Sequence, residues 1–178
     1  MSDGGGVTVG FQSQLDQLLV GCCRDLFSTY QVDVELRSPG EVLCPDKLSL
    51  AGVMGFGGRH VRGAVVLGSS DEPLLASNPC GTTSRRDWIC ELANQLTGRV
   101  KIQLLALGIE IRLATPAGLS ANSLAPMAVR PRGLQVFVAG AGFICSWIDC
   151  ELVDGVEFPQ ALPEGTELGI REGDLLLF

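Results

Sequence analysis

The stretch Trp88-Ile-Cys-Glu-Leu-Ala-Asn-Gln-Leu-Thr-Gly-Arg-Val-Lys101 decides how the rest of the chain is interpreted, because it has the spacing of an amphipathic helix. After a capping box at Ser84–Asp87, we expect this helix to run to about Leu107 and to stop at Gly108. Its apolar residues share one face of a helical wheel: Ile89, Leu92, Ala93, Leu96, Val100 and Leu107. Glu91, Asn94 and Gly98 lie together on the opposite face.

The polar face of this helix has two interpretations. Glu91 and Asn94 are three residues apart, so their side chains are neighbours on the helix surface. Gly98 costs about 1 kcal/mol relative to alanine inside a helix, which a contact elsewhere must offset. The face is either a docking site for another molecule, or an ordinary polar surface whose glycine marks a close helix-to-sheet contact. These three residues alone do not decide between the two interpretations.

Composition limits the class of protein. A chain of 178 residues fits one domain, and we expect a flexible N-terminal tail over residues 1–10 and a single domain over residues 11–178. The 20 acidic residues outnumber the 13 basic ones, and no run of Arg or Lys occurs, which disfavours a nucleic-acid partner. The first six residues lack the pattern of a signal peptide, so we expect a cytoplasmic protein with no membrane insertion.

The seven cysteines show no Cys-x-x-Cys pair, and His60 is the single histidine. A disulfide framework and a metal site are therefore both disfavoured. We expect most of the cysteines to be unpaired, small buried residues. We also expect no metal and no cofactor of the protein's own.

Strand patterns surround the central helix. The sequence predicts an α/β fold of the α+β type, with long helices packed on a largely antiparallel sheet. Gly57-Gly58-Arg59-His60 reads as a hairpin turn, since it lacks the ending of a phosphate-binding loop. The further predicted elements are helices at 11–30 and 70–77, and strands at 32–36, 48–56, 61–67, 109–113, 133–139, 143–152 and 175–178.

One segment carries a resemblance to a known family. Glu91-Leu-Ala-Asn94-Gln-Leu-Thr-Gly98, followed by Lys101, Gly108, Pro116 and Gly118, resembles the CheC/CheX/FliY family of chemotaxis phosphatases, and most of all its CheX-like branch. The likeness extends over about Phe11 to Leu152, and its specific part is Asp87 to Gly118. It implies an α/β fold in which long helices pack on an antiparallel-rich sheet.

The resemblance implies a phosphatase of two-component signalling. Its substrate would be the phospho-aspartate on the receiver domain of a CheY-like response regulator. By the same resemblance, Asn94 positions the attacking water, Glu91 engages a lysine of the receiver, and Gln95, Gly98 and Lys101 contact the partner. Mg²⁺ would come from the receiver, and CheX-like relatives suggest a homodimer formed through the sheet.

The number of sites is also a prediction from the resemblance. CheC-like relatives carry the Glu-x-x-Asn motif on two helices. Here the first predicted helix has Asp16-Gln-Leu-Leu19 instead, so one site is expected. Two functions stay open at this point, a receiver phosphatase and a non-catalytic receiver-binding or signalling module with the same fold. A free-standing metabolic enzyme has little support, since no Ser-His-Asp set or cofactor loop occurs.

Overall fold

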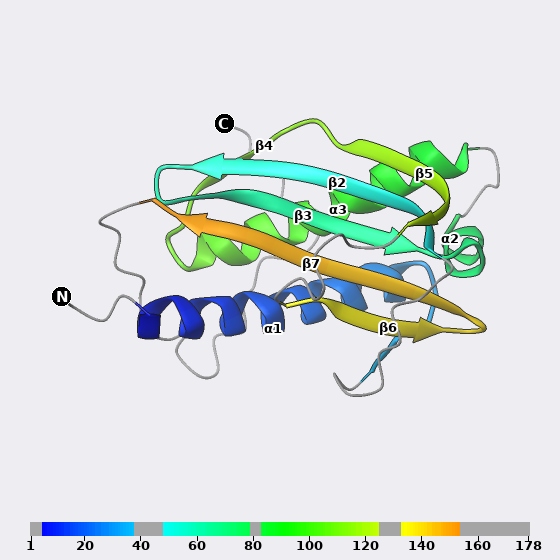
Figure 1. The fold of residues 1–178 in the computed structure, drawn as a ribbon, viewed down its shortest axis with the longest axis horizontal. Helices are drawn as coiled ribbons and strands as arrows, with labels where there is room; N and C mark the ends of the chain where they lie inside the picture. The colour runs from blue at the N-terminus through cyan, green and yellow to red at the C-terminus, as the bar shows by residue number, and fades with distance from the viewer. Residues whose placement is uncertain (1–4, 38–47, 79–82, 125–132, 154–178) are drawn as a thin grey trace.

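A seven-stranded sheet carries two long helices on one face (Figure 1). This computed structural model describes residues 5–37, 48–78, 83–124 and 133–153. Its helices are α1 (Gly5–Thr29), α2 (Asp71–Ser77) and α3 (Arg85–Ala106). Its strands are β1 (Glu35–Leu36), β2 (Leu48–Gly58), β3 (Val61–Ser69), β4 (Ile111–Leu113), β5 (Ala117–Leu124), β6 (Gln135–Ala139) and β7 (Gly142–Leu152).

The sheet has the order β1-β6-β7-β3-β2-β4, and β5 also pairs with β2. Every pairing is antiparallel, which confirms the predicted α+β class. The two predicted hairpins are present. β2 and β3 pair from Leu50↔Ser69 to Gly57↔Arg62, and β6 and β7 pair from Gln135↔Ser146 to Ala139↔Gly142.

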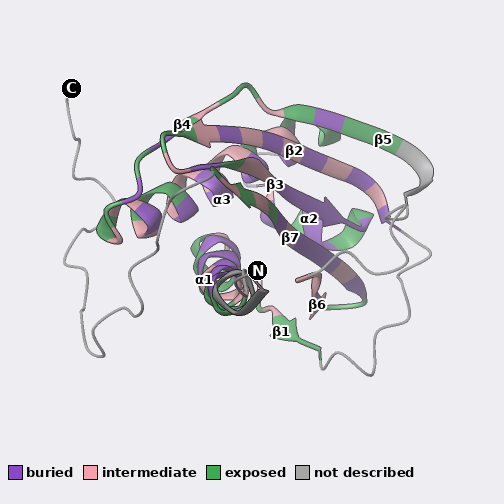
Figure 2. Cartoon of the chain, turned by 60° about the vertical axis from the view of Figure 1, so that its left-hand side comes forward, coloured by how far each residue is buried: buried purple, intermediate pink, exposed green. Residues whose placement is uncertain are grey.

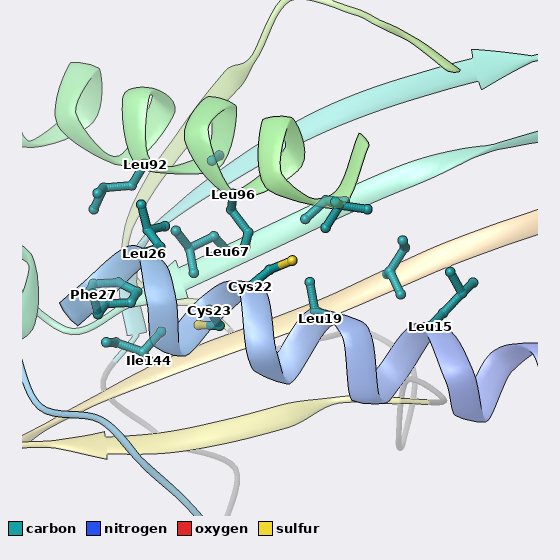
Figure 3. Close-up of a cluster of buried hydrophobic side chains, with 14 of the residues drawn as sticks. Leu15, Leu19, Cys22, Cys23, Leu26, Phe27, Leu67, Leu92, Leu96 and Ile144 are labelled. Atoms are coloured by element: carbon teal, nitrogen blue, oxygen red, sulfur yellow. The ribbon is translucent and has the colours of Figure 1, made fainter. Parts of the chain in front are cut away.

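The core lies between the sheet and helices α1 and α3 (Figure 2). Figure 3 shows how side chains of the two helices point toward one another, with Leu67 and Ile144 of the sheet beside them. The predicted apolar face of α3 is buried, except that Leu107 is half-buried just after the helix end. Burying a large aliphatic side chain contributes about 1.5–3 kcal/mol, so this face fixes α3 on the sheet.

Local sequence signals set the ends of α3. At its start, the Ser84 hydroxyl oxygen accepts a hydrogen bond from the Asp87 backbone N–H at 3.1 Å, as a capping box requires. At its end, Gly108 adopts φ +76°. The N–H groups of Gly108 and Ile109 turn back to the carbonyls of Leu105 and Leu104, both at 2.9 Å, which forms a Schellman motif.

Helix α1 ends in the same motif without a glycine. Gln31 adopts φ +58° in the position that Gly108 occupies after α3. The N–H groups of Gln31 and Val32 reach the carbonyls of Ser28 and Phe27, both at 3.0 Å. This turn fixes Tyr30 as the last residue before the chain leaves the helix.

The structure departs from the sequence prediction at several boundaries. α1 begins at Gly5, so residues 5–10 of the predicted tail continue the helix; once a helix is nucleated, each added residue gains a backbone hydrogen bond. β1 and β4 begin later than predicted, because Val32 and Ile109 belong to the helix-ending turns. β5 was not predicted at all, because Pro116 and Gly118 read as turn residues.

The cysteine prediction is confirmed where the structure describes the chain. No disulfide joins any of Cys22, Cys23, Cys90, Cys145 and Cys150. Burial raises the pKa of Cys22 and of Cys23 to about 12, so both are unreactive thiols at neutral pH. Cys44, Cys80 and the predicted strand 175–178 lie outside the described residues. No helix of the described part is long and apolar enough to cross a membrane.

Candidate functional site

Four of the predicted site residues share the side of α3 that faces away from the sheet. Glu91 and Lys101 are exposed, and Asn94 and Gly98 are half-buried. Their spacing of three, four and three residues keeps them on one side of the helix, and we call this set the α3 open face. A side chain at Gly98 would meet nothing within 4 Å, so its glycine does not serve a close helix-to-sheet contact.

The Asn94 side chain is half-buried on the α3 open face. Among the residues that the structure describes, none forms a hydrogen bond with its side chain. An asparagine amide both donates and accepts, so it can orient a water molecule in two ways at once. The neighbouring Ala93 and Leu96 are completely buried and hold the helix that carries it.

The Glu91 carboxylate accepts a hydrogen bond from another side chain of α3. Its Oε1 accepts a hydrogen bond from Gln95 Nε2 at 2.9 Å. Gln95 Oε1 in turn accepts from the Tyr30 hydroxyl at 2.8 Å, across 65 residues of sequence. Both polar atoms of Gln95 therefore have partners within the chain, and the predicted contact of Gln95 with another molecule stays a prediction.

Strand β5 runs close beside the first turns of α3. Gly118 is buried there, and a Cβ at this position would lie 2.8 Å from Cys90 Sγ and 2.9 Å from Arg86 Cγ. The Arg86 Nε donates to the Gly118 carbonyl at 3.1 Å. Gly118, one of the residues that carry the family resemblance, thus allows the close helix-to-strand contact that supports α3 just before Glu91.

Two residues near the α3 open face were missed from the sequence. Ile102 follows Gly98 by one turn and is 41% exposed, so it is an apolar side chain on the polar side of the helix. Its position was readable from the helical wheel. The role of Tyr30 could not be predicted from the sequence, because its contact with Gln95 joins two segments that only the tertiary fold brings together.

One groove of the described structure lies away from Glu91 and Asn94. This groove of about 530 Å³ runs between α1 and the end of α3, lined by residues that include Leu15, Leu18, Cys22, Gln103 and Leu107. Glu91 and Asn94 do not line it. Within the described ranges, no three His, Cys, Asp or Glu side chains gather closely enough to hold a metal ion.

Comparison with solved structures assigns the fold. The chain is similar to the chemotaxis protein CheX from Vibrio vulnificus, with a TM-score of 0.62, 17% identity, and coverage of 76% of this chain and 95% of that one. It is also similar to a CheC-like superfamily protein from Shewanella, with a TM-score of 0.60, 17% identity, and coverage of 77% and 97%. A third similar structure is the CheX-CheY-BeF3-Mg²⁺ complex from Borrelia burgdorferi, with a TM-score of 0.55, 15% identity, and coverage of 75% and 96%.

These neighbours confirm the predicted likeness to CheX and CheC-like proteins at the level of the fold. No protein-family model and no curated protein matches the sequence.

Proposed function

From the CheX-type fold of the chain, we propose that the protein is a phosphatase that hydrolyses the phospho-aspartate on a CheY-like receiver domain. The observation that carries this proposal is the Asn94 amide, which has no partner among the described residues and stands beside the Glu91 carboxylate on an open helix face. A structure with a similar fold contains CheX together with CheY, BeF3 and Mg²⁺, which supports a receiver as the partner.

The shape of the site also favours a partner that brings most of the catalytic groups. Phosphoryl transfer needs an in-line nucleophile and charge stabilisation. A receiver supplies the acyl phosphate, a lysine and Mg²⁺, so the element it lacks is a held water molecule. In our proposal Asn94 holds that water in line with the phosphorus atom. The water oxygen bonds to phosphorus, the bond to the aspartate oxygen breaks, and the products are the carboxylate and inorganic phosphate.

Glu91 has a separate role in this proposal. An exposed carboxylate beside the amide is suited to an ion pair with the lysine of the receiver, which would set the register of the two proteins. Gly98 leaves room for the backbone of the partner, and Ile102 and Lys101 contribute an apolar and a charged contact. Binding and chemistry are thus assigned to different side chains on one helix face.

The direct test is the lifetime of a phosphorylated receiver. CheY-type receivers of the same organism are phosphorylated with acetyl phosphate, freed of the donor, and followed with and without the protein. We expect the protein to shorten the lifetime of at least one receiver in a Mg²⁺-dependent way. Binding that leaves the lifetime unchanged would reject the enzyme and leave a receiver-binding module.

Location and assembly complete the proposal. We propose that the protein acts in the cytoplasm, where receivers are phosphorylated, and that two copies associate through the sheet. Sedimentation velocity on the full chain tests the assembly, and a single species of monomer mass across the micromolar range would reject the homodimer.

A further inference from the structure

A chain of hydrogen bonds links the end of α1 to the candidate site on α3. The Tyr30 hydroxyl donates to Gln95 Oε1 at 2.8 Å, and Gln95 Nε2 donates to Glu91 Oε1 at 2.9 Å. Chemistry sets the direction of this chain, because a carboxylate can only accept. Gln95 must therefore turn its NH2 group to Glu91, which leaves its oxygen for a donor, and Tyr30 supplies one.

Tyr30, at the α1 end of this series of hydrogen bonds, is held in place by contacts within the fold. The turn around Gln31 holds the backbone of Tyr30 at the end of α1. The Tyr30 ring packs edge-to-face against Trp88, with ring centroids 5.3 Å apart and an interplanar angle of 82°. Trp88 Nε1 in turn donates to the buried Ser77 hydroxyl at 3.0 Å, so α1, α2 and α3 all contribute to the anchor.

We propose that Tyr30 and Gln95 are positioning residues that hold the Glu91 carboxylate ready for the cation of the receiver, a role that rests on the proposed function. An exposed glutamate loses side-chain freedom when it enters an ion pair, and this loss cancels much of the attraction. A carboxylate that is already held loses less on binding. Among the described residues nothing donates to Glu91 Oε2, which leaves this oxygen open to the partner.

The first test removes polar atoms from the series of hydrogen bonds that joins Tyr30 to Glu91. Tyr30→Phe keeps the ring against Trp88 and deletes the hydroxyl, and Gln95→Met keeps the length of the side chain and deletes both polar atoms. Each should raise the Kd for a CheY-type receiver loaded with beryllofluoride and Mg²⁺ by about three- to tenfold, the effect of one lost hydrogen bond. Each should raise KM for the phosphorylated receiver and leave kcat unchanged. Gln103→Met, about two turns further along α3, is the matched control and should change neither.

The second test asks whether Tyr30 acts through Glu91. In a Glu91→Ala background, Tyr30→Phe should have no further effect on Kd, because the group that it positions is gone. An equal loss in both backgrounds, or no loss in either, would overturn the positioning role. A wild-type protein that binds the receiver without dephosphorylating it would reject the enzyme alone, since the binding cycle still decides the role of Tyr30. A wild-type protein that does not bind the receiver would overturn both proposals.

Discussion

The two long helices, α1 and α3, lie side by side on one face of the sheet, and both end in a Schellman motif. The residue with positive φ is Gly108 after α3 and Gln31 after α1. Glycine adopts this conformation freely, whereas another residue pays about 1 kcal/mol or more for it. Gln31 is thus the residue in the unfavourable backbone conformation. It lies at the end of α1, directly after Tyr30, whose hydroxyl contacts Gln95.

The two helices differ more in the exposure of two residue pairs that have the same spacing. On α3, the pair Glu91 and Asn94 points away from the sheet. On α1, the pair with the same spacing is Asp16 and Leu19; Leu19 is completely buried, and Asp16 is half-buried beside Gly133 with a 2.8 Å hydrogen bond from Gln12. Residue pairs with the same spacing therefore lie in the core on α1 and on the exposed surface on α3.

The largest effect should come from copying the α3 pair onto α1. Leu19→Asn places an amide three residues after a carboxylate, but at a position with no solvent access. The lost apolar burial and the unpaired amide should reduce the free energy of unfolding by about 3–5 kcal/mol. Urea denaturation measures this, and the exposed Gln17→Asn on the same helix should stay within about 0.5 kcal/mol of wild type. A wild-type midpoint for Leu19→Asn would show that this face of α1 is not part of the core.

The next largest effect should be on chemistry at Asn94. Asn94→Ala removes the group that we assign to the water, and should slow receiver dephosphorylation by about a hundredfold or more. Its affinity for the beryllofluoride-loaded receiver and its melting temperature should stay close to wild type, because Asn94 has no partner among the described residues. Gln17→Ala, on the exposed side of α1, is the control. Near wild-type turnover by Asn94→Ala would reject the proposed mechanism.

Charge reversal at Glu91 should separate binding from folding. Glu91→Lys puts two cations in contact at the proposed interface, and should weaken receiver binding by about 2 kcal/mol at low salt, and by less at high salt. A receiver with the opposite charge swap should restore part of the affinity. Glu110→Lys makes the same change in net charge at an exposed residue beyond the end of α3, and should have little effect. Equal behaviour of the two variants would remove Glu91 from the interface.

Two glycine-to-alanine variants should have a smaller effect. Gly98 lies on the α3 open face, and Gly52 of β2 lies against the buried side of α3. Gly98→Ala should stabilise the protein by about 1 kcal/mol through helix propensity, since its Cβ would meet nothing within 4 Å. The same methyl group should weaken receiver binding if the partner approaches here. Gly52→Ala should destabilise, because a Cβ there would lie 2.5 Å from the Ile89 carbonyl oxygen and 2.7 Å from Ala93 Cβ. Thermal melts of both variants measure these changes in stability. A destabilised Gly98→Ala would show that Gly98 packs against another part of the protein.

Helical and strand periodicity explain why much of this arrangement could be predicted. The apolar face of α3, the capping box at Ser84 and the two hairpins all depend on residues that are close in sequence. The missed features depend on distant contacts. β5 exists because residues around Gly118 pair with β2 and pass against α3, and Tyr30 joins the site from the far end of α1. No local pattern encodes either contact.

The smallest effect should be a change in pH dependence at Asp16, the α1 counterpart of Glu91. Burial raises the pKa of Asp16 above its ordinary value of 3.8, and the hydrogen bond from Gln12 offsets part of this shift. A raised carboxyl pKa contributes stability that is complete below pH 3.8 and is lost as the pH rises through the folded-state pKa. Asp16→Asn keeps an acceptor for Gln12 and removes the charge, so it should be more stable than wild type at neutral pH. Melting curves from pH 3.5 to 7.5 should show the two proteins converging toward the acid end, and an Asp16→Asn that is less stable at neutral pH would mean that the ionised carboxylate stabilises α1.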